Sequence, residues 1–87
     1  MIMSTDFVKT IHIHYYATLR EQRGVNQEAL TTQAKTVKEL YEELQKRYGF
    51  KWTKNLLKVA VNNEYRSWQE PLRNGDTVVF IPPVAGG

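Results

Sequence analysis

Hydrophobic and polar residues alternate along residues 10–16, near the start of the chain. The side chains predicted to share one buried face of this strand are Ile11, Ile13 and Tyr15. Residues 17–23 are rich in helix formers and end at Gly24, which suits a left-handed C-cap, so we expect a short helix there. A second strand is expected at residues 28–33, where the sparse apolar content favours a sheet edge.

A longer helix is predicted to begin after Thr36. Thr36 can cap the first turn, and Glu39, three residues on, can reach back to complete a capping box. Apolar residues follow at the spacing of a single helical stripe, at Val37, Leu40, Tyr41, Leu44 and Tyr48. Gly49 stands where a C-terminal cap belongs. The pattern therefore predicts an amphipathic helix with one buried face.

The second half of the chain is predicted to supply the remaining strands. Residues 58–61 form one strand, which turns at Asn62-Asn63 and returns through Tyr65. The turn signal at residues 74–76 precedes the apolar run 77–81, which is typical of a central strand. Because the helix has one apolar stripe and the sheet needs one covered face, we expect an α+β domain with a mixed sheet packed on one long helix.

The composition narrows the class of protein. A chain of 87 residues, with 41% hydrophobic and 24% charged residues, predicts one globular domain. We expect a poorly ordered lead-in at residues 1–10, the domain at 11–81 and an extended tail at 82–87. No apolar stretch approaches the roughly 20 residues of a membrane span, and the basic residues are scattered. Neither a membrane nor a nucleic-acid partner is therefore predicted, and the cytoplasm is the expected compartment.

The C-terminal tail carries the candidate chemistry. Pro82-Pro83 ends the last strand because neither residue can donate a ladder hydrogen bond. The small residues that follow are Val84, Ala85, Gly86 and Gly87. Glycine can lie in a narrow channel, so a partner's active site could close around the Gly87 carboxylate. Adenylation of that carboxylate would open its carbon to attack by sulfur, and the thiocarboxylate formed would suit a chain without cysteine.

The segment PLRNGDTVVFIPPVAGG, residues 71–87, resembles the terminal motif of the MoaD/ThiS sulfur-carrier family, which includes the small subunits of molybdopterin synthase. The run Tyr15-Tyr16-Ala17 with Leu19-Arg20-Glu21 is similar to the first strand and short helix of the family, and residues 59–62 are similar to its third strand. The resemblance covers the chain from about Ile11 to the end and implies a ubiquitin-like β-grasp fold. The residues before Thr10 and the sparse second strand depart from the family pattern.

The same resemblance implies roles and partners. Gly87 would carry an acyl adenylate and then a thiocarboxylate, and the residues lining a partner's channel would be Pro82, Pro83, Val84, Ala85 and Gly86. The partners would be the large subunit of molybdopterin synthase, an E1-like adenylyltransferase that uses ATP, and a sulfurtransferase. The chain would be the sulfur-donor subunit of a two-subunit enzyme, with no catalytic machinery and no bound cofactor of its own. It would help to build the dithiolene of molybdopterin from a cyclic pyranopterin precursor.

Several alternatives stay open at this stage. A thiamine-pathway sulfur carrier and a ubiquitin-like protein modifier would use the same terminal carboxylate, whereas an interaction module would use only the sheet. Phe80 and Ile81 point to opposite faces of the last strand, so we expect only one of them at a partner interface. His12 and His14 share a strand face, but no third ligand completes a metal site, and we expect them to be solvated.

Two further groups of residues are expected to be structural. Asp76 is better explained by the turn after Gly75 than by acid–base catalysis. The aromatic residues expected in the core or as anchors are Tyr41, Trp52 and Trp68.

Overall fold

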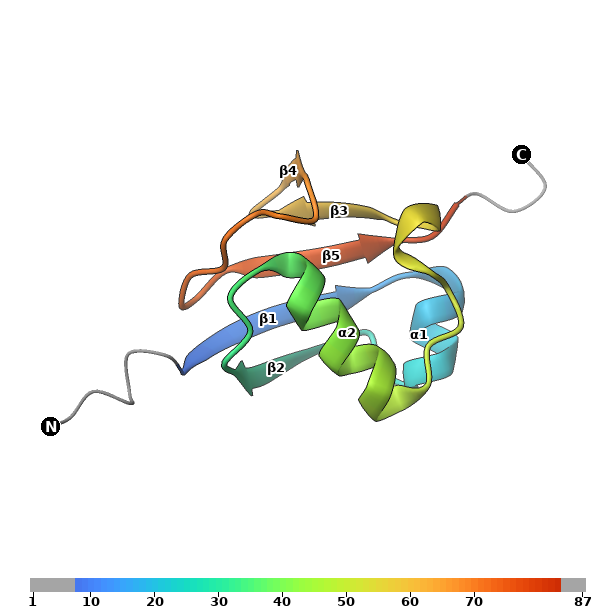
Figure 1. The fold of residues 1–87 in the computed structure, drawn as a ribbon. Helices are drawn as coiled ribbons and strands as arrows, with labels where there is room; N and C mark the ends of the chain where they lie inside the picture. The colour runs from blue at the N-terminus through green and yellow to red at the C-terminus, as the bar shows by residue number, and fades with distance from the viewer. Residues whose placement is uncertain (1–7, 84–87) are drawn as a thin grey trace, which may run out of the picture.

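The computed structural model describes residues 8–83 as a five-stranded sheet covered on one face by a helix (Figure 1). The elements are β1 (Lys9–Tyr15), α1 (Ala17–Arg23), β2 (Gln27–Thr32), α2 (Val37–Tyr48), the 3₁₀ turn η2 (Lys54–Leu56), β3 (Lys58–Val61), β4 (Glu64–Arg66) and β5 (Thr77–Ile81). The strand order is β2-β1-β5-β3-β4. β1 and β5 are parallel and the other neighbouring pairs are antiparallel. This arrangement confirms the predicted mixed-sheet β-grasp fold.

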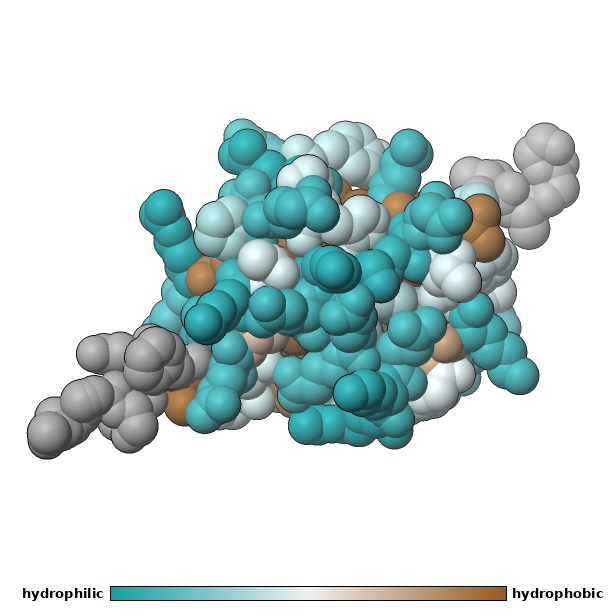
Figure 2. Space-filling view, viewed as in Figure 1, coloured by the Kyte–Doolittle hydropathy of each residue, from teal (hydrophilic) through white to brown (hydrophobic). Residues whose placement is uncertain are grey.

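The core lies between α2 and the sheet. The buried residues from the three central strands are Ile11, Ile13, Tyr15, Val59, Val61, Val78 and Phe80. The α2 residues packed against them are Val37, Leu40, Tyr41 and Leu44, as the stripe predicted. The outer face of α2 is mainly hydrophilic (Figure 2). Between residues 8 and 83, no helix is long and apolar enough to cross a membrane.

The N-terminus of α2 confirms half of the predicted capping box. The Thr36 hydroxyl accepts a hydrogen bond from the backbone N–H of Glu39 at 3.3 Å, as expected of an N-cap. The Glu39 carboxylate, however, accepts from the backbone N–H of Lys35 at 2.9 Å, one residue before the cap. The predicted return bond to Thr36 was therefore wrong in its donor. At the other end, Gly49 adopts φ 71° and its N–H donates to the carbonyl of Gln45, which confirms the C-cap.

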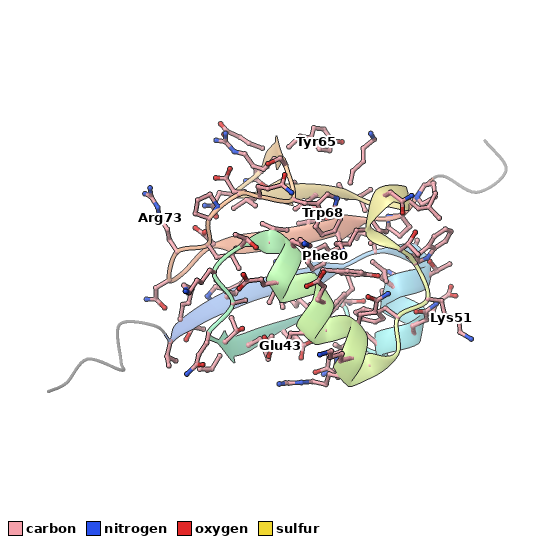
Figure 3. All side chains as sticks on the ribbon, in the orientation of Figure 1. Glu43, Lys51, Tyr65, Trp68, Arg73 and Phe80 are labelled. Carbon is pink, nitrogen blue, oxygen red and sulfur yellow. The ribbon has the colours of Figure 1, made fainter. Side chains whose placement is uncertain are left out.

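The crossing between β4 and β5, which comprises residues 67–76, is hydrogen-bonded to the first turn of α2. The backbone N–H of Val37 donates to the Glu70 carbonyl at 3.0 Å, and that of Lys38 donates to the Trp68 carbonyl at 2.9 Å. These bonds satisfy two amides that have no partner within the helix. The Trp68 ring stacks on Phe80, with ring centroids 6.0 Å apart, and its centroid lies 5.6 Å from that of Tyr41 on α2; Trp68 and Phe80 are neighbours in Figure 3. Trp68 is thus the predicted anchor of the crossing.

The boundaries of the strands differ slightly from the expected ones. β1 begins at Lys9, so the last residues of the predicted lead-in belong to the sheet, and residues 1–7 lie outside the described part. β2 begins and ends one residue earlier than predicted and is an edge strand, as expected. Asp76 is a turn residue, because its carboxylate accepts from the Arg73 backbone N–H at 2.8 Å and the Asn62 side-chain amide at 2.9 Å.

Candidate functional site

The root of the C-terminal tail, which comprises residues 80–83, lies at the end of the central strand of the sheet. β5 lies between β1 and β3, and its last residues pair with both neighbours, Phe80 with Tyr15 and Ile81 with Lys58. Pro82 is buried and Pro83 is exposed. Of the residues predicted to line a partner's channel, Pro82 packs into the domain and Pro83 is accessible, and the channel role of the segment stays a prediction. The other predicted tail residues, Val84, Ala85, Gly86 and Gly87, lie outside the described residues.

The structure separates the two candidate interface residues at the end of β5. Phe80 is completely buried, and its ring centroid lies 5.1 Å from that of Tyr41. Ile81 is only partly buried and, because side chains alternate along a strand, it points to the face that α2 does not cover. Phe80 is therefore a core residue. Ile81 is the member of the pair that a partner can reach.

The face of the sheet opposite α2, which we name the open face, continues from Ile81 across β3 and β4. Val79 pairs with Ala60, and Ala60 pairs with Tyr65, so these three side chains share the open face. Tyr65 is 72% exposed. At the tail end of the sheet, Tyr16 follows β1 and is 51% exposed. Two exposed tyrosines beside partly buried aliphatic residues form a surface suited to protein contact.

Sequence reasoning missed Tyr16 and Tyr65 as candidate interface residues. Tyr16 was used as part of the family resemblance at residues 15–17, and Tyr65 only to mark the return strand. Their signal is an aromatic residue at a strand position facing away from the core, which can be recognised only when the covered face is known.

The short helix α1 lies beside the tail root and is fixed by side-chain hydrogen bonds (Figure 1). The indole N–H of Trp52 donates to the Thr18 hydroxyl at 2.6 Å, and the Tyr41 hydroxyl donates to the Trp52 carbonyl at 2.6 Å. Burial raises the pKa of Tyr41 to about 12, so this hydroxyl remains a donor at neutral pH. α1 is therefore connected to α2 through Trp52, which confirms Trp52 and Tyr41 as anchors.

A carboxylate on β2 fixes the other end of α1. Glu28 accepts two hydrogen bonds from Arg23, at 2.8 and 3.0 Å, and one from the Tyr15 hydroxyl at 2.5 Å. The Tyr48 hydroxyl donates to it at 3.4 Å, and the Arg23 guanidinium lies 4.1 Å from the Tyr48 ring centroid. These bonds, above all those from Arg23, lower the pKa of Glu28, while burial raises the pKa of Tyr15. The sequence analysis did not predict this Glu28 cluster.

The remaining polar residues give no sign of a metal site. His12 is exposed and His14 is partly buried, and both line an open-face hollow of about 490 Å³ with Ala29 and Thr77. Within residues 8–83, no group of three or more His, Cys, Asp or Glu side chains is placed to hold a metal ion. Within residues 8–83 the sheet holds the tail root between β1 and β3 and exposes the open face beside it.

Comparison with known proteins gives a family match and a full-length relative. The ThiS family matches residues 13–87. The molybdopterin synthase sulfur carrier subunit of Haemophilus influenzae is 32% identical over 81 residues, which span 88% of this chain and 99% of that protein.

Two solved structures have a similar fold. The putative molybdopterin converting factor subunit 1 from Pyrococcus furiosus is 30% identical, with a TM-score of 0.72, over 87% of this chain and 99% of that one. A complex of subunits 1 and 2 of the molybdopterin-converting factor from Helicobacter pylori contains a chain that is 26% identical, with a TM-score of 0.61. That alignment covers 90% of this chain and 99% of the other.

Proposed function

Because the chain belongs to the ThiS family, we propose that it is the sulfur carrier subunit of a molybdopterin synthase. The observation that carries this proposal is the family match over residues 13–87, which includes Gly86-Gly87. The Haemophilus influenzae relative, which bears this function in its name, matches over nearly its whole length. The structure contributes a β-grasp domain whose last strand leads directly into the tail.

The chemistry proposed for the tail needs only its terminal carboxylate. An E1-like adenylyltransferase joins the Gly87 carboxylate to the α-phosphate of ATP, and pyrophosphate leaves. A sulfur nucleophile delivered by a sulfurtransferase then attacks the acyl carbon, and the nucleotide leaves. The thiocarboxylate formed donates its sulfur to a cyclic pyranopterin precursor in the active site of the large subunit. In this scheme the ATP is bound by the activating enzyme in the cytoplasm, and the carrier itself holds no cofactor.

The domain is proposed to position the tail for its partners. Ile81, Tyr16 and Tyr65 would contact a partner through the open face while residues 83–87 enter its channel. The contacts that support this arrangement are the pairing of Ile81 with Lys58 and of Phe80 with Tyr15, which fix the end of β5 before the tail. The Helicobacter pylori complex of two subunits supports the large subunit as one such partner.

The test is mass spectrometry of the chain produced together with its activating enzyme and sulfurtransferase. Replacement of one carboxylate oxygen by sulfur adds about 16 Da, which oxidation could mimic in the intact protein. Trypsin cleavage after Arg73 removes this ambiguity, because residues 74–87 contain no Lys, Arg, Met or Trp and both methionines, Met1 and Met3, lie at the other end. We expect the gain on this peptide in the wild type and its absence in a Gly87 deletion.

A thiol-reactive alkylating reagent gives a second readout. The chain has no cysteine, so the thiocarboxylate would be its one reactive sulfur anion. Adenylation without sulfur loading would instead favour a protein modifier, and no adenylation by any cognate enzyme would favour an interaction module. Complementation of strains that lack molybdopterin or thiamine would separate the two sulfur-carrier pathways.

A further inference from the structure

A cleft on the β3–β4 side of the molecule is not used by the proposed function. It is lined by Leu57, Lys58, Val59, Tyr65, Arg66 and Trp68 and has a volume of about 460 Å³. Leu57 and Val59 are core residues, with 5% and 2% of their surface exposed, so the base of the cleft is apolar. We name it the Trp68 cleft. Its position follows from the sheet, because α2 packs over the middle strands and leaves this edge uncovered (Figure 1).

The lining of the Trp68 cleft combines an apolar base with hydrogen-bond donors. Within residues 8–83 the indole N–H of Trp68 has no hydrogen-bond partner, in contrast to that of Trp52. Every buried side-chain nitrogen and oxygen in this part of the chain has a partner, so the Trp68 N–H is accessible. Lys58 and Arg66 add two cations; the Arg66 guanidinium also pairs with Glu64, which lines the neighbouring cleft, while no acidic residue lines the Trp68 cleft itself. Such a site suits an apolar side chain that lies next to a carboxylate.

A neighbouring cleft of about 440 Å³ has a different character. It is lined by Val61, Asn62, Glu64, Arg66, Glu70, Pro71, Arg73 and Asp76. Its three carboxylates offset its two guanidinium groups, and it lacks an aromatic base. An acidic, apolar segment would therefore be accepted by the Trp68 cleft and not by this one. Arg73 belongs to the second cleft only and lies well away from Trp68 (Figure 3).

The Trp68 cleft is continuous with the open face and with the tail root. Tyr65 faces the open side of the sheet with Ala60, and it also borders the cleft. Lys58 pairs with Ile81 on β5, but β4 begins its pairing with β3 only at Val59, so the sheet edge at Lys58 is uncovered. A partner that contacts Ile81 and Tyr65 can therefore reach around this edge into the cleft without leaving the surface of the domain.

We propose that the Trp68 cleft receives a segment of the tail-accepting large subunit, with an aliphatic or aromatic side chain in the cleft and a neighbouring carboxylate on Arg66 and the Trp68 N–H. The identity of the partner rests on the proposed function. The cleft itself is a further point of attachment, next to the open face and distinct from the tail. It would fix the rotation of the carrier about the axis of the inserted tail.

The test is the affinity of the unloaded carrier for the purified large subunit, measured by titration calorimetry. Arg66→Glu reverses the charge at the rim, and we expect its Kd to rise about tenfold. Trp68→Phe keeps a ring against Phe80 and removes the N–H, with an expected rise of about threefold. Arg73→Glu is the matched control for charge, because it makes the same change outside the cleft, and its Kd should stay within about twofold of the wild type. Thermal melts of the variants check that each is folded.

A spectroscopic readout reports the cleft directly. The chain contains two tryptophans, so 5-fluorotryptophan labelling gives two fluorine signals, which a Trp52→Phe variant assigns. We expect the Trp68 signal to shift when the large subunit saturates the carrier. An unmoved Trp68 signal, or wild-type affinity in both cleft variants, would overturn the inference while leaving the sulfur-carrier function intact.

Two other outcomes would also overturn it, for different reasons. If the wild type does not bind the large subunit at all, the proposed function loses its partner and the cleft loses its occupant together. If the carrier self-associates with rising concentration and Arg66→Glu abolishes this, the occupant is a second copy of the chain.

Discussion

The two faces of β5 differ in what surrounds them, although their residues alternate along the same five-residue strand. Val78 and Phe80 point toward α2 and are completely buried. Thr77, Val79 and Ile81 point to the open face and keep part of their surface exposed. Both sets are largely apolar, so composition does not distinguish them. The difference arises because one long helix with one apolar stripe can cover only one face of the sheet.

Residues on the covered face of β5 contribute mainly to stability, and residues on its open face are available for recognition. The covered face supplies the burial that holds the domain together, and the open face keeps apolar and aromatic surface available beside the tail. In a small domain with a limited core, leaving such surface exposed is unfavourable unless a partner covers it. We therefore expect substitutions on the two faces to act on different measurements.

The largest effect on stability is expected on the covered face. Phe80→Ala removes a ring that contacts Tyr41 and Trp68, and truncation of a buried Phe typically lowers the free energy of unfolding by about 3–5 kcal/mol. Ile81→Ala, the neighbouring change on the open face, should cost only about 1 kcal/mol because its site is already partly exposed. Urea unfolding followed by circular dichroism measures both. Equal losses at the two positions would contradict the separation of the faces.

The next effect tests the Glu28 cluster, which lies on the covered side of the sheet. Glu28→Gln keeps the shape of the side chain and removes its charge, which leaves Arg23 without its ion partner. We expect a loss of about 1–3 kcal/mol at neutral pH. Glu43→Gln is a matched control, since its ion pair with Arg47 is more exposed.

The pH dependence of the same variant sharpens this test. The folded pKa of Glu28 lies below its usual value of 4.5, so its contribution is complete above pH 4.5 and is lost as the pH falls through the lower, folded value. The stability of the wild type should therefore decrease on acidification more steeply than that of Glu28→Gln. Parallel pH profiles for the two proteins would show that the cluster does not contribute to acid sensitivity.

A smaller free-energy change is expected from the open face, and it concerns binding. Tyr65→Ala removes the most exposed aromatic ring, and we expect the Kd for the large subunit to rise about tenfold, which corresponds to about 1.4 kcal/mol. The melting temperature should hardly change, because Tyr65 is outside the core. Val25→Ala, which truncates another exposed hydrophobic residue in the loop between α1 and β2, serves as the control. Unchanged affinity in Tyr65→Ala would remove the open face from the proposed interface.

The smallest effect is expected at the cap of the covering helix. Thr36→Ala removes the hydroxyl that accepts from the Glu39 N–H and should lower stability by about 1 kcal/mol. Thr36→Ser keeps the oxygen and should restore most of the loss. Thermal unfolding of the two variants gives the comparison, and an alanine variant as stable as the serine variant would show that the cap does not support α2.

The helices and strands could be predicted from the sequence because each has a local signal, whereas the 3₁₀ turn η2 was not predicted. The alternation at Ile11, Ile13 and Tyr15 and the stripe on α2 both depend on neighbours in the chain, and both are confirmed. The sequence could also place Phe80 and Ile81 on opposite faces. It could not say which face α2 covers, because that depends on the packing of the whole sheet.

Contacts between distant residues could not be predicted in the same way. The Glu28 cluster joins β1, α1, β2 and the end of α2. The spacing of these residues along the chain does not predict that their side chains meet. The Glu39 carboxylate accepts a hydrogen bond from the backbone N–H of Lys35 instead of that of Thr36. The conformation of the chain before α2 decides between these two donors, and the spacing of Thr36 and Glu39 does not predict it. The roles of Gly86 and Gly87 stay predictions, which the tryptic peptide can test.

The parallel pairing of β1 with β5 has a consequence for the order in which the domain can form. The central strand of the sheet is the last one synthesised, and its partner β1 is the first. Contacts between strands so distant in the sequence form slowly, and until β5 is present β1 and β3 have unpaired edges. A chain interrupted before residue 77 can therefore neither complete its core nor carry a tail. A partner that acts on the tail would therefore meet a chain whose central strand is already present.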